Sequence, residues 1–306
     1  MLKFWPSKHD KGMLGIETSS DGVAIAHIVM ESNRPRLVSC DYVGADAITS
    51  VAETLSERIA ALGLKSIPCN WVLPDSDYSL LMVEAPNVPD EELREAMRWR
   101  VKDLITFPVE QASLGVFPLP ADGVRGGTKM TYVAIADQQQ IQSRSEWAKT
   151  AKVTLKSIDI AELALRNIAE LVAEDQRSLA IVRLKQGSGD LALVKEGQLY
   201  LSRQFDIKYQ GGLFDELPEE SLILELQRSL DYFERQMGQG PPAAILFCGD
   251  NITPDKITQT IKNSLPGQAS CLNLAEKIIG IDQCEEYTVQ LCLGAIGGAL
   301  RKQVAA

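Results

Sequence analysis

The stretch LGIETSSDGVAIAHIV, from Leu14 to Val29, decides the fold. Its two apolar runs flank Ser19-Ser20-Asp21-Gly22, and an Asp-Gly pair between such runs is typical of the tight turn of a β-hairpin. The stretch therefore predicts two short antiparallel strands. The hydroxyl groups at the turn leave two alternatives open: a loop that wraps around a phosphate, or a hairpin without a ligand.

Length and composition predict a folded protein with two lobes. The chain has 306 residues, of which 45% are hydrophobic and 24% charged. Its formal net charge of −10 provides no general basic surface, so we expect no nucleic-acid partner. The opening MLKFWPSKHDKG lacks the apolar core of a secretory signal, and the longest uncharged runs, 236–249 and 287–300, are shorter than the roughly 20 residues that span a bilayer. We expect a cytoplasmic protein that crosses no membrane.

The cysteines and histidines do not predict a metal site or a nucleophilic enzyme. The six cysteines lack the two-residue spacing of zinc ligands, and only His9 and His27 are available to join them. Reduced thiols fit the cytoplasm. With two histidines, we expect neither a Ser-His-Asp nor a Cys-His catalytic set.

The first half of the chain predicts an α/β lobe with an insertion. The hairpin, a strand over PRLVSCDYV, a helix over 46–62 and a strand into NWVLP begin this lobe. A strand over YSLLMVEAP, a helix after Pro89 and two strands around the turn ADGVRGGTK form the inserted subdomain. A helix over 137–151, the strand VTLKSIDI and the helix AELALRNIAELVAE return to the first lobe.

The second half repeats this order, which predicts two related lobes facing each other across a cleft. Residues 177–207 indicate three strands with a loop at 187–190, and a helix over 218–237, the strand AAILFCG and a helix after Pro254 follow. The last segment, TVQLCLGAIGGALR, contains glycines that destabilise a helix by themselves. We expect them to permit close packing against the second lobe's sheet, with the approach of a ligand as the alternative.

Candidate cleft residues follow the predicted strands. Glu17 can lie beside a metal-bound phosphate, while Thr18, Ser19 and Ser20 offer hydroxyl and backbone donors. The loop GSGD, from Gly187 to Asp190, has the same character. A serine-rich turn needs no ligand, however, and this is the simpler interpretation of both loops.

Two further positions also have a structural and a binding interpretation. Gly249 ends a strand, where it can let an adenine or ribose approach the backbone or can simply belong to a turn. Asp159 can hold a water or a cation in the cleft, or it can cap the helix that follows; we favour the cap.

The helix after Pro89 carries a candidate partner-binding residue. Its first turn is acidic, which suits the helix dipole. Its apolar face consists of Leu93, Ala96, Met97, Val101 and Leu104. Trp99 lies on the opposite flank near Glu95 and Lys102. It either packs under a neighbouring segment or anchors a protein partner.

With these segments assembled, the sequence resembles the PilM-like type IV pilus assembly proteins, and among them those of the mannose-sensitive haemagglutinin (MSHA) pilus. The resemblance spans most of the chain. It rests on the opening hairpin, VPDEELREAMRWRVKDLITFPVEQASLGVFPL, KSIDIAELALRNIAEL, the strands from 179 to 207, AILFCGDN and CLGAIGGALR. It implies an α/β, two-lobed actin-like (ribonuclease H-like) fold with an inserted 1C subdomain of the type found in the division protein FtsA. The implied parts are lobe 1A (1–75 and 138–176), subdomain 1C (76–137) and lobe 2A with a small helical 2B part (177–306).

The resemblance also implies an ATP cleft between the lobes. At its two phosphate loops the family has Asp-Ile-Gly where this chain has Glu17-Thr18-Ser19 and Arg183-Leu184-Lys185. The arginine reverses the charge beside the ion, which argues against magnesium, and the lost glycines crowd the approach of a phosphate to the backbone. Arg183 and Lys185 can still contact a phosphate, so ATP binding without magnesium or hydrolysis stays open.

The resemblance implies a cytoplasmic scaffold at the inner face of the inner membrane, peripheral to that membrane through its partner only. The partner is an inner-membrane PilN-like protein whose N-terminal tail docks in a groove between the first lobe and the inserted subdomain. We expect no catalytic residue and a degenerate nucleotide cleft. The alternatives are an active actin-like ATPase or small-molecule kinase, and the cytoplasmic domain of a type II secretion L protein, which a membrane span would normally follow; none follows here.

Overall fold

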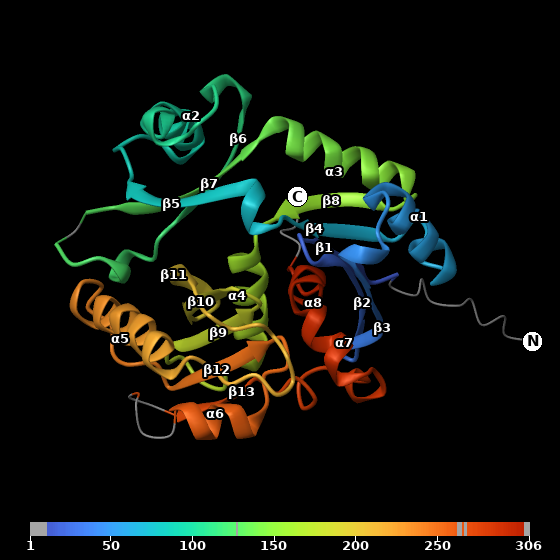
Figure 1. Cartoon of the computed structure of the whole chain (residues 1–306). Coiled ribbons are helices and arrows are strands. Elements are labelled where there is room, and N and C mark those ends of the chain that lie inside the picture. The colour runs from blue at the N-terminus through green and yellow to red at the C-terminus, as the bar shows by residue number, and fades with distance from the viewer. Residues whose placement is uncertain (1–10, 127, 262–264, 266–267, 303–306) are drawn as a thin grey trace, which may run out of the picture.

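The chain forms two large β-sheets and one small one (Figure 1). The structure, a computed structural model, describes residues 11–126, 128–261, 265 and 268–302. Residues 1–10, in the N-terminal segment that we expected to carry no secretory signal, lie outside the described residues. Both large sheets have five strands, in the order β3-β2-β1-β4-β8 and β11-β10-β9-β12-β13. When the strands of each sheet are counted along the chain, both sheets have the order third-second-first-fourth-fifth. This shared order confirms the predicted repetition.

The first sheet grows from the opening hairpin. Its strands are β1 (Met13–Thr18), β2 (Gly22–Glu31), β3 (Arg34–Gly44), β4 (Pro68–Val72) and β8 (Thr154–Asp159). β1 and β2 pair antiparallel, as the Asp-Gly turn predicts, while β4 lies parallel to β1. Leu14 and Ile16 of β1 are fully buried towards α1 (Val51–Ala61) and α3 (Gln138–Thr150), which cover the outer face.

The predicted start of the helix at residue 46 is wrong. Residues Ala45–Ala47 form a single 3-10 turn, and α1 begins only at Val51. Ser50 sets this start, because its hydroxyl accepts a hydrogen bond from the Glu53 amide at 3.4 Å. Further 3-10 turns lie at Asp75–Asp77 (η2), Lys102–Leu104, Val109–Gln111, Ala121–Gly123 and Ile281–Gln283.

The second sheet consists of β9 (Leu179–Lys185), β10 (Ser188–Lys195), β11 (Gln198–Asp206), β12 (Ala244–Gly249) and β13 (Gln268–Cys271). Helices α5 (Glu219–Arg235) and α6 (Pro254–Ile261) lie on its outer side (Figure 1). The predicted loop at 187–190 is shorter than expected. Ser188 already begins β10, and Asp190 is a buried strand residue.

Two helices lie between the large sheets, α4 (Ala161–Val172) and α8 (Leu293–Ala299), with α7 (Glu286–Leu291) before α8 (Figure 1). The expectation that α8 packs its glycines on the second lobe's sheet is wrong. A Cβ on Gly15 of β1 would lie 1.7 Å from the Ala295 carbonyl oxygen, and one on Gly297 would lie 2.3 Å from that of Ala164. The glycines instead bring α8 against the first sheet and α4.

The inserted subdomain contains β5 (Tyr78–Glu84), α2 (Asp90–Arg100), β6 (Ala112–Pro118) and β7 (Met130–Asp137), with the strand order β5-β7-β6. Met97 and Val101 of α2 are fully buried against this sheet. Leu104, which we placed on the same apolar face, is 58% exposed because the helix ends before it. Among the described residues, no helix has the length and apolar character needed to cross a membrane.

Candidate functional site

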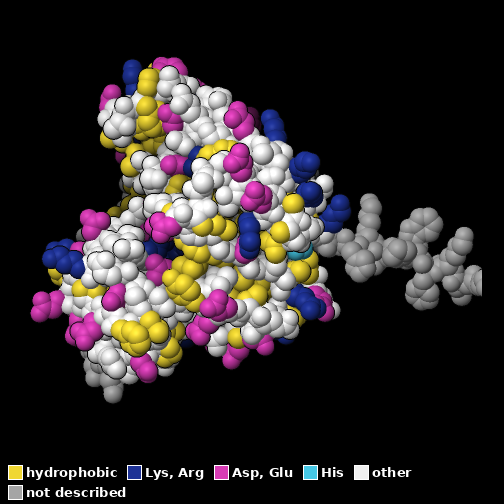
Figure 2. Space-filling model, turned by 45° about the vertical axis from the view of Figure 1, so that its right-hand side comes forward, with side chains coloured by type: hydrophobic (Ala, Val, Ile, Leu, Met, Phe, Trp, Pro, Cys, Tyr) yellow, Lys and Arg dark blue, Asp and Glu magenta, His cyan; other side chains and the backbone are white. Residues whose placement is uncertain are grey.

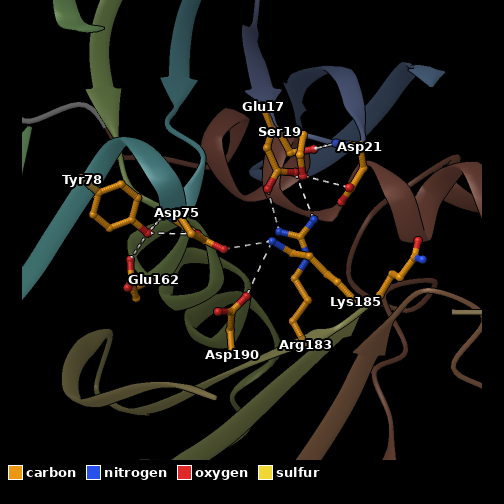
Figure 3. A network of polar contacts seen from close by, with 12 residues as sticks. Glu17, Ser19, Asp21, Asp75, Tyr78, Glu162, Arg183, Lys185 and Asp190 are labelled. Atoms are coloured by element: carbon orange, nitrogen blue, oxygen red, sulfur yellow. Dashed lines mark hydrogen bonds and ion pairs between the residues drawn. The ribbon is translucent and has the colours of Figure 1, made fainter. Parts of the chain in front are cut away.

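The central strands of the two sheets, β1 and β9, end at a cavity of about 370 Å³ between the lobes. Five of the predicted site residues line it: Glu17, Ser19, Ser20, Arg183 and Lys185. The two sequence segments predicted to be corresponding phosphate loops are therefore close together in space (Figure 3).

A buried ion pair joins the lobes at the base of this cavity. Arg183 donates from Nη1 to Glu17 Oε1 at 2.7 Å and from Nη2 to Glu17 Oε2 at 3.1 Å (Figure 3). The two side chains are only 6% and 7% exposed. Burial alone would raise the pKa of Glu17, but the Arg183 guanidinium lowers that pKa below its ordinary value. Both groups are therefore charged, and the two Nη groups of Arg183 pair with the two oxygens of Glu17, while Arg183 Nε is buried without a hydrogen-bond partner among the described residues.

The packing of α8 fixes the position of Glu17. Alternation along β1 places Gly15 and Glu17 on the face towards α8. A Cβ on Gly294 of α8 would lie 2.2 Å from the Glu17 carboxyl carbon. Only glycine at position 294 leaves room for this carboxylate, so the helix and the ion pair depend on each other.

Lys185 is also paired. Its Nζ lies 3.4 Å from Asp75 Oδ2 and 3.7 Å from Asp190 Oδ2, and its side chain is 13% exposed. Burial raises the pKa of Asp190 to about 6, although Lys185 opposes this shift. Both cations of the predicted second phosphate loop are therefore engaged with carboxylates of the protein.

A second polar contact lies next to this group (Figure 3). The Tyr78 hydroxyl donates a hydrogen bond to Glu162 Oε2 at 2.6 Å. Tyr78 Oη also lies 3.3 Å from Asp75 Oδ1. Glu162 is 3% exposed, and burial raises its pKa to about 7 despite the bond from Tyr78. Neither Tyr78 nor Glu162 was singled out from the sequence.

The hydroxyl groups of the hairpin make contacts within the protein. Thr18 is buried, and its Oγ1 accepts a hydrogen bond from Trp71 Nε1 at 3.3 Å. Ser19 Oγ accepts from the Asp21 amide at 3.2 Å, and Ser20 Oγ donates to Asp21 Oδ1 at 2.9 Å. The turn is thus stabilised without a ligand.

Four predicted residues do not line the cavity: the buried Thr18, Asp159, Gly187 and Gly249. The favoured role of Asp159 as the cap of the following helix is wrong, because Ile160 is the N-cap of α4 and no side chain in the described part of the chain caps this helix. Asp159 Oδ1 accepts a hydrogen bond from the Ile160 amide at 3.1 Å, and its Oδ2 pairs with Arg301 Nη1 at 2.5 Å. Gly187 and Gly249 have φ angles of +78° and +115°. A Cβ on Gly249 would lie 2.0 Å from the Leu184 carbonyl oxygen, so this glycine serves the close approach of β12 to β9.

The cavity has more negative than positive groups. Its ionisable lining consists of four carboxylates, Glu17, Asp21, Asp46 and Asp250, against two cations, Arg183 and Lys185. Sequence reasoning missed Asp21 and Asp250, although both directly follow segments that it had selected. No group of three or more acidic, histidine or cysteine side chains placed to hold a metal occurs in the part of the chain that the structure describes.

The predicted partner-binding residues lie on α2. Trp99 is 61% exposed, so it does not pack under a neighbouring segment. Glu95 pairs with Arg98 at 3.3 Å, and Lys102 is exposed. A hollow of about 430 Å³ lies beside this helix, between the inserted subdomain and the start of α3. Its lining is Arg94, Arg98, Glu110, Ala112, Ser113, Leu114 and Gln138.

Surface charges are mixed on the face that Figure 2 shows. Lys and Arg side chains alternate there with Asp and Glu side chains and gather into no broad basic patch.

The comparisons with known proteins concern the fold. No family model matches the sequence, and no curated protein matches it. A chain of the structure described as a PilM-PilN type IV pilus biogenesis complex is similar, with a TM-score of 0.72 and 18% identity over 94% of this chain and 98% of that chain. So is the cytoplasmic domain of EpsL, an inner membrane component of the type II secretion system of Vibrio cholerae, with a TM-score of 0.52 and 14% identity over 95% and 96%.

The fold is α/β, two-lobed and actin-like. This confirms the fold class predicted from the sequence, since both similarities extend over nearly the whole of each chain. At these identities the likeness establishes the fold alone.

Proposed function

We propose that this chain is a cytoplasmic scaffold of type IV pilus assembly that binds the N-terminal tail of an inner-membrane PilN-like protein. It lies at the inner face of the inner membrane and reaches the membrane through this partner only. One observation carries the proposal: the fold is similar over 94% of the chain to a chain from a PilM-PilN complex, with a TM-score of 0.72.

Within this function the nucleotide cleft is degenerate. ATP with its magnesium needs cationic or backbone donors for the phosphates and a carboxylate for the metal. Here the two cations are neutralised by Glu17, Asp75 and Asp190, and the remaining lining carboxylates repel a triphosphate. These residues do not fit a magnesium-bound triphosphate. In place of a nucleotide, the Glu17–Arg183 ion pair connects the two lobes.

The partner's tail docks on the inserted subdomain. Trp99 with its neighbours Glu95 and Lys102 provides an exposed aromatic anchor with charges of both signs around it. The adjoining hollow beside α2 adds Arg94 and Arg98, and it lies where the inserted subdomain meets the first lobe. This location supports the groove expected between these two parts.

A binding measurement tests the docking surface. A peptide with the N-terminal tail sequence of the PilN-like protein encoded beside this chain is titrated into wild type and Trp99→Ala. We expect at least about a tenfold weaker affinity in the variant with little change in melting temperature, because exposed aromatic anchors contribute about 2 kcal/mol or more to interfaces. Phe214→Ala is the matched control, since Phe214 is 94% exposed on the second lobe. Unchanged affinity in Trp99→Ala, or equal losses in both variants, rejects this surface.

Within the pilus proteins, we assign the chain to the MSHA type, and its parts to lobe 1A (1–75 and 138–176), a 1C subdomain of the FtsA type (76–137) and lobe 2A with a small 2B part (177–306). Sequence resemblance supports this finer assignment. Pilus genes of the MSHA type next to its gene would agree with it, and secretion genes there would contradict it.

A further inference from the structure

The segment that leads from the first lobe into the inserted subdomain is held from three sides. This segment contains η2 (Asp75–Asp77) and the first residue of β5, Tyr78. Asp75 pairs with Lys185 of the second lobe, Asp77 forms an ion pair with Arg144 of α3, and Tyr78 donates to Glu162 of α4. The entry to the inserted subdomain is therefore attached to both lobes.

A second attachment joins the inserted subdomain to the second lobe alone. Asp122, in the loop between β6 and β7, accepts hydrogen bonds from Tyr200 Oη at 2.7 Å and from Lys195 Nζ at 2.9 Å. Tyr132 of β7 donates from its hydroxyl to the Tyr200 carbonyl oxygen at 2.9 Å. The subdomain thus extends from the first lobe to the far sheet, as its position in Figure 1 shows.

Two of the interlobe ion pairs come from one strand. Arg183 and Lys185 are two residues apart on β9, so they project from the same face of the second sheet. Separation of the lobes would break the Glu17–Arg183 pair and the Asp75–Lys185 pair together. It would also pull on the Asp122 contacts, because these anchor the inserted subdomain to the lobe that moves.

We propose that the inserted subdomain is a brace between the lobes, whose position is coupled to lobe closure through Asp75, Tyr78, Lys185 and Asp122. One consequence of this inference rests on the proposed function, because it concerns the bound tail. A tail bound on the inserted subdomain stabilises the closed lobes, and the closed lobes hold the subdomain in its tail-binding position. Coupling of this kind is reciprocal.

Hydrogen exchange of the whole chain tests the coupling without any partner. Lys185→Met replaces a side chain of the second lobe and removes its ion pair with Asp75, and we expect amides of β5 and of the loop from 119 to 124 to exchange about tenfold faster. Arg58→Met is the control, because it breaks an ion pair with Asp41 inside the first lobe. Faster exchange confined to the second lobe in Lys185→Met, or equal changes in the control, overturns the proposal.

A milder variant approaches the same coupling from the other side. Tyr78→Phe removes one hydroxyl, and we expect it to increase exchange in β9, on the opposite lobe. It also decides the question if Lys185→Met fails to fold; unchanged exchange in β9 then overturns the proposal.

Titration of the tail peptide separates this inference from the proposed function. We expect Lys185→Met, far from Trp99, to weaken the tail about fivefold or more. If the peptide does not bind wild type, the proposed function fails while the exchange data still test the brace. If it binds wild type and Lys185→Met equally, the brace is rejected and the proposed function stands.

Discussion

Removing one partner of the Glu17–Arg183 pair is expected to destabilise the whole protein. The Glu17 side chain is 7% exposed and lies next to α8, and in Arg183→Met its carboxylate loses both hydrogen bonds from the guanidinium. An uncompensated buried charge of this kind costs about 3–5 kcal/mol of unfolding free energy. Replacing both members by apolar side chains removes the penalty, so Glu17→Met with Arg183→Met should fall within about 1 kcal/mol of wild type or exceed it.

The assay is urea unfolding at pH 7, followed by far-ultraviolet circular dichroism. The dependence of the unfolding free energy on pH provides a second check. The pKa of Glu17 is lowered from its ordinary value of 4.5, so the pair's contribution is present above pH 4.5 and is lost as pH falls through the lowered value. A loss smaller than about 1 kcal/mol in Arg183→Met, or a double variant less stable than the single one, would show that no buried charge is left uncompensated.

Other consequences concern the helix packing and a buried acid. Gly15→Ala puts a Cβ 1.7 Å from the Ala295 carbonyl oxygen, so we expect a loss of more than about 3 kcal/mol by urea unfolding, whereas Gly63→Ala, where no atom lies within 4 Å, should lose less than about 2 kcal/mol; equal losses would contradict this account of α8. Burial raises the pKa of Glu162 to about 7 from its ordinary 4.5, so the folded state loses stability as pH rises through this range. Glu162→Gln should therefore gain up to about 3 kcal/mol over wild type at pH 8 and little at pH 4, as thermal melts across this range would reveal, and a pH-independent difference would argue against a buried ionising group.

The repeated fold could be predicted from the sequence because local patterns carry it. The hairpin around Asp21-Gly22 and the second set of strands are each specified by turn residues and apolar alternation. The predicted start of α1 was wrong because a single capping residue, Ser50, determines where this helix begins. The prediction for the packing of α8 was wrong because this helix approaches Gly15 and Ala164, which lie far away in the sequence.

The candidate site was only partly predictable for the same reason. The resemblance selected Glu17, Arg183 and Lys185 as cleft residues, but their mutual pairing depends on the distance between two strands 166 residues apart. Nothing in the local pattern around Tyr78 or Asp75 indicates that they meet Glu162 and Lys185. The helix-cap role favoured for Asp159 was wrong because its ion-pair partner, Arg301, lies 142 residues away in the sequence.

Calorimetric titration of ATP, with and without magnesium, into the purified chain tests whether the Glu17–Arg183 ion pair stands between the lobes in place of a nucleotide. We expect no measurable heat of binding up to millimolar ATP in either condition, and no phosphate release. Tight binding that requires magnesium, accompanied by turnover, would instead favour an active ATPase or kinase.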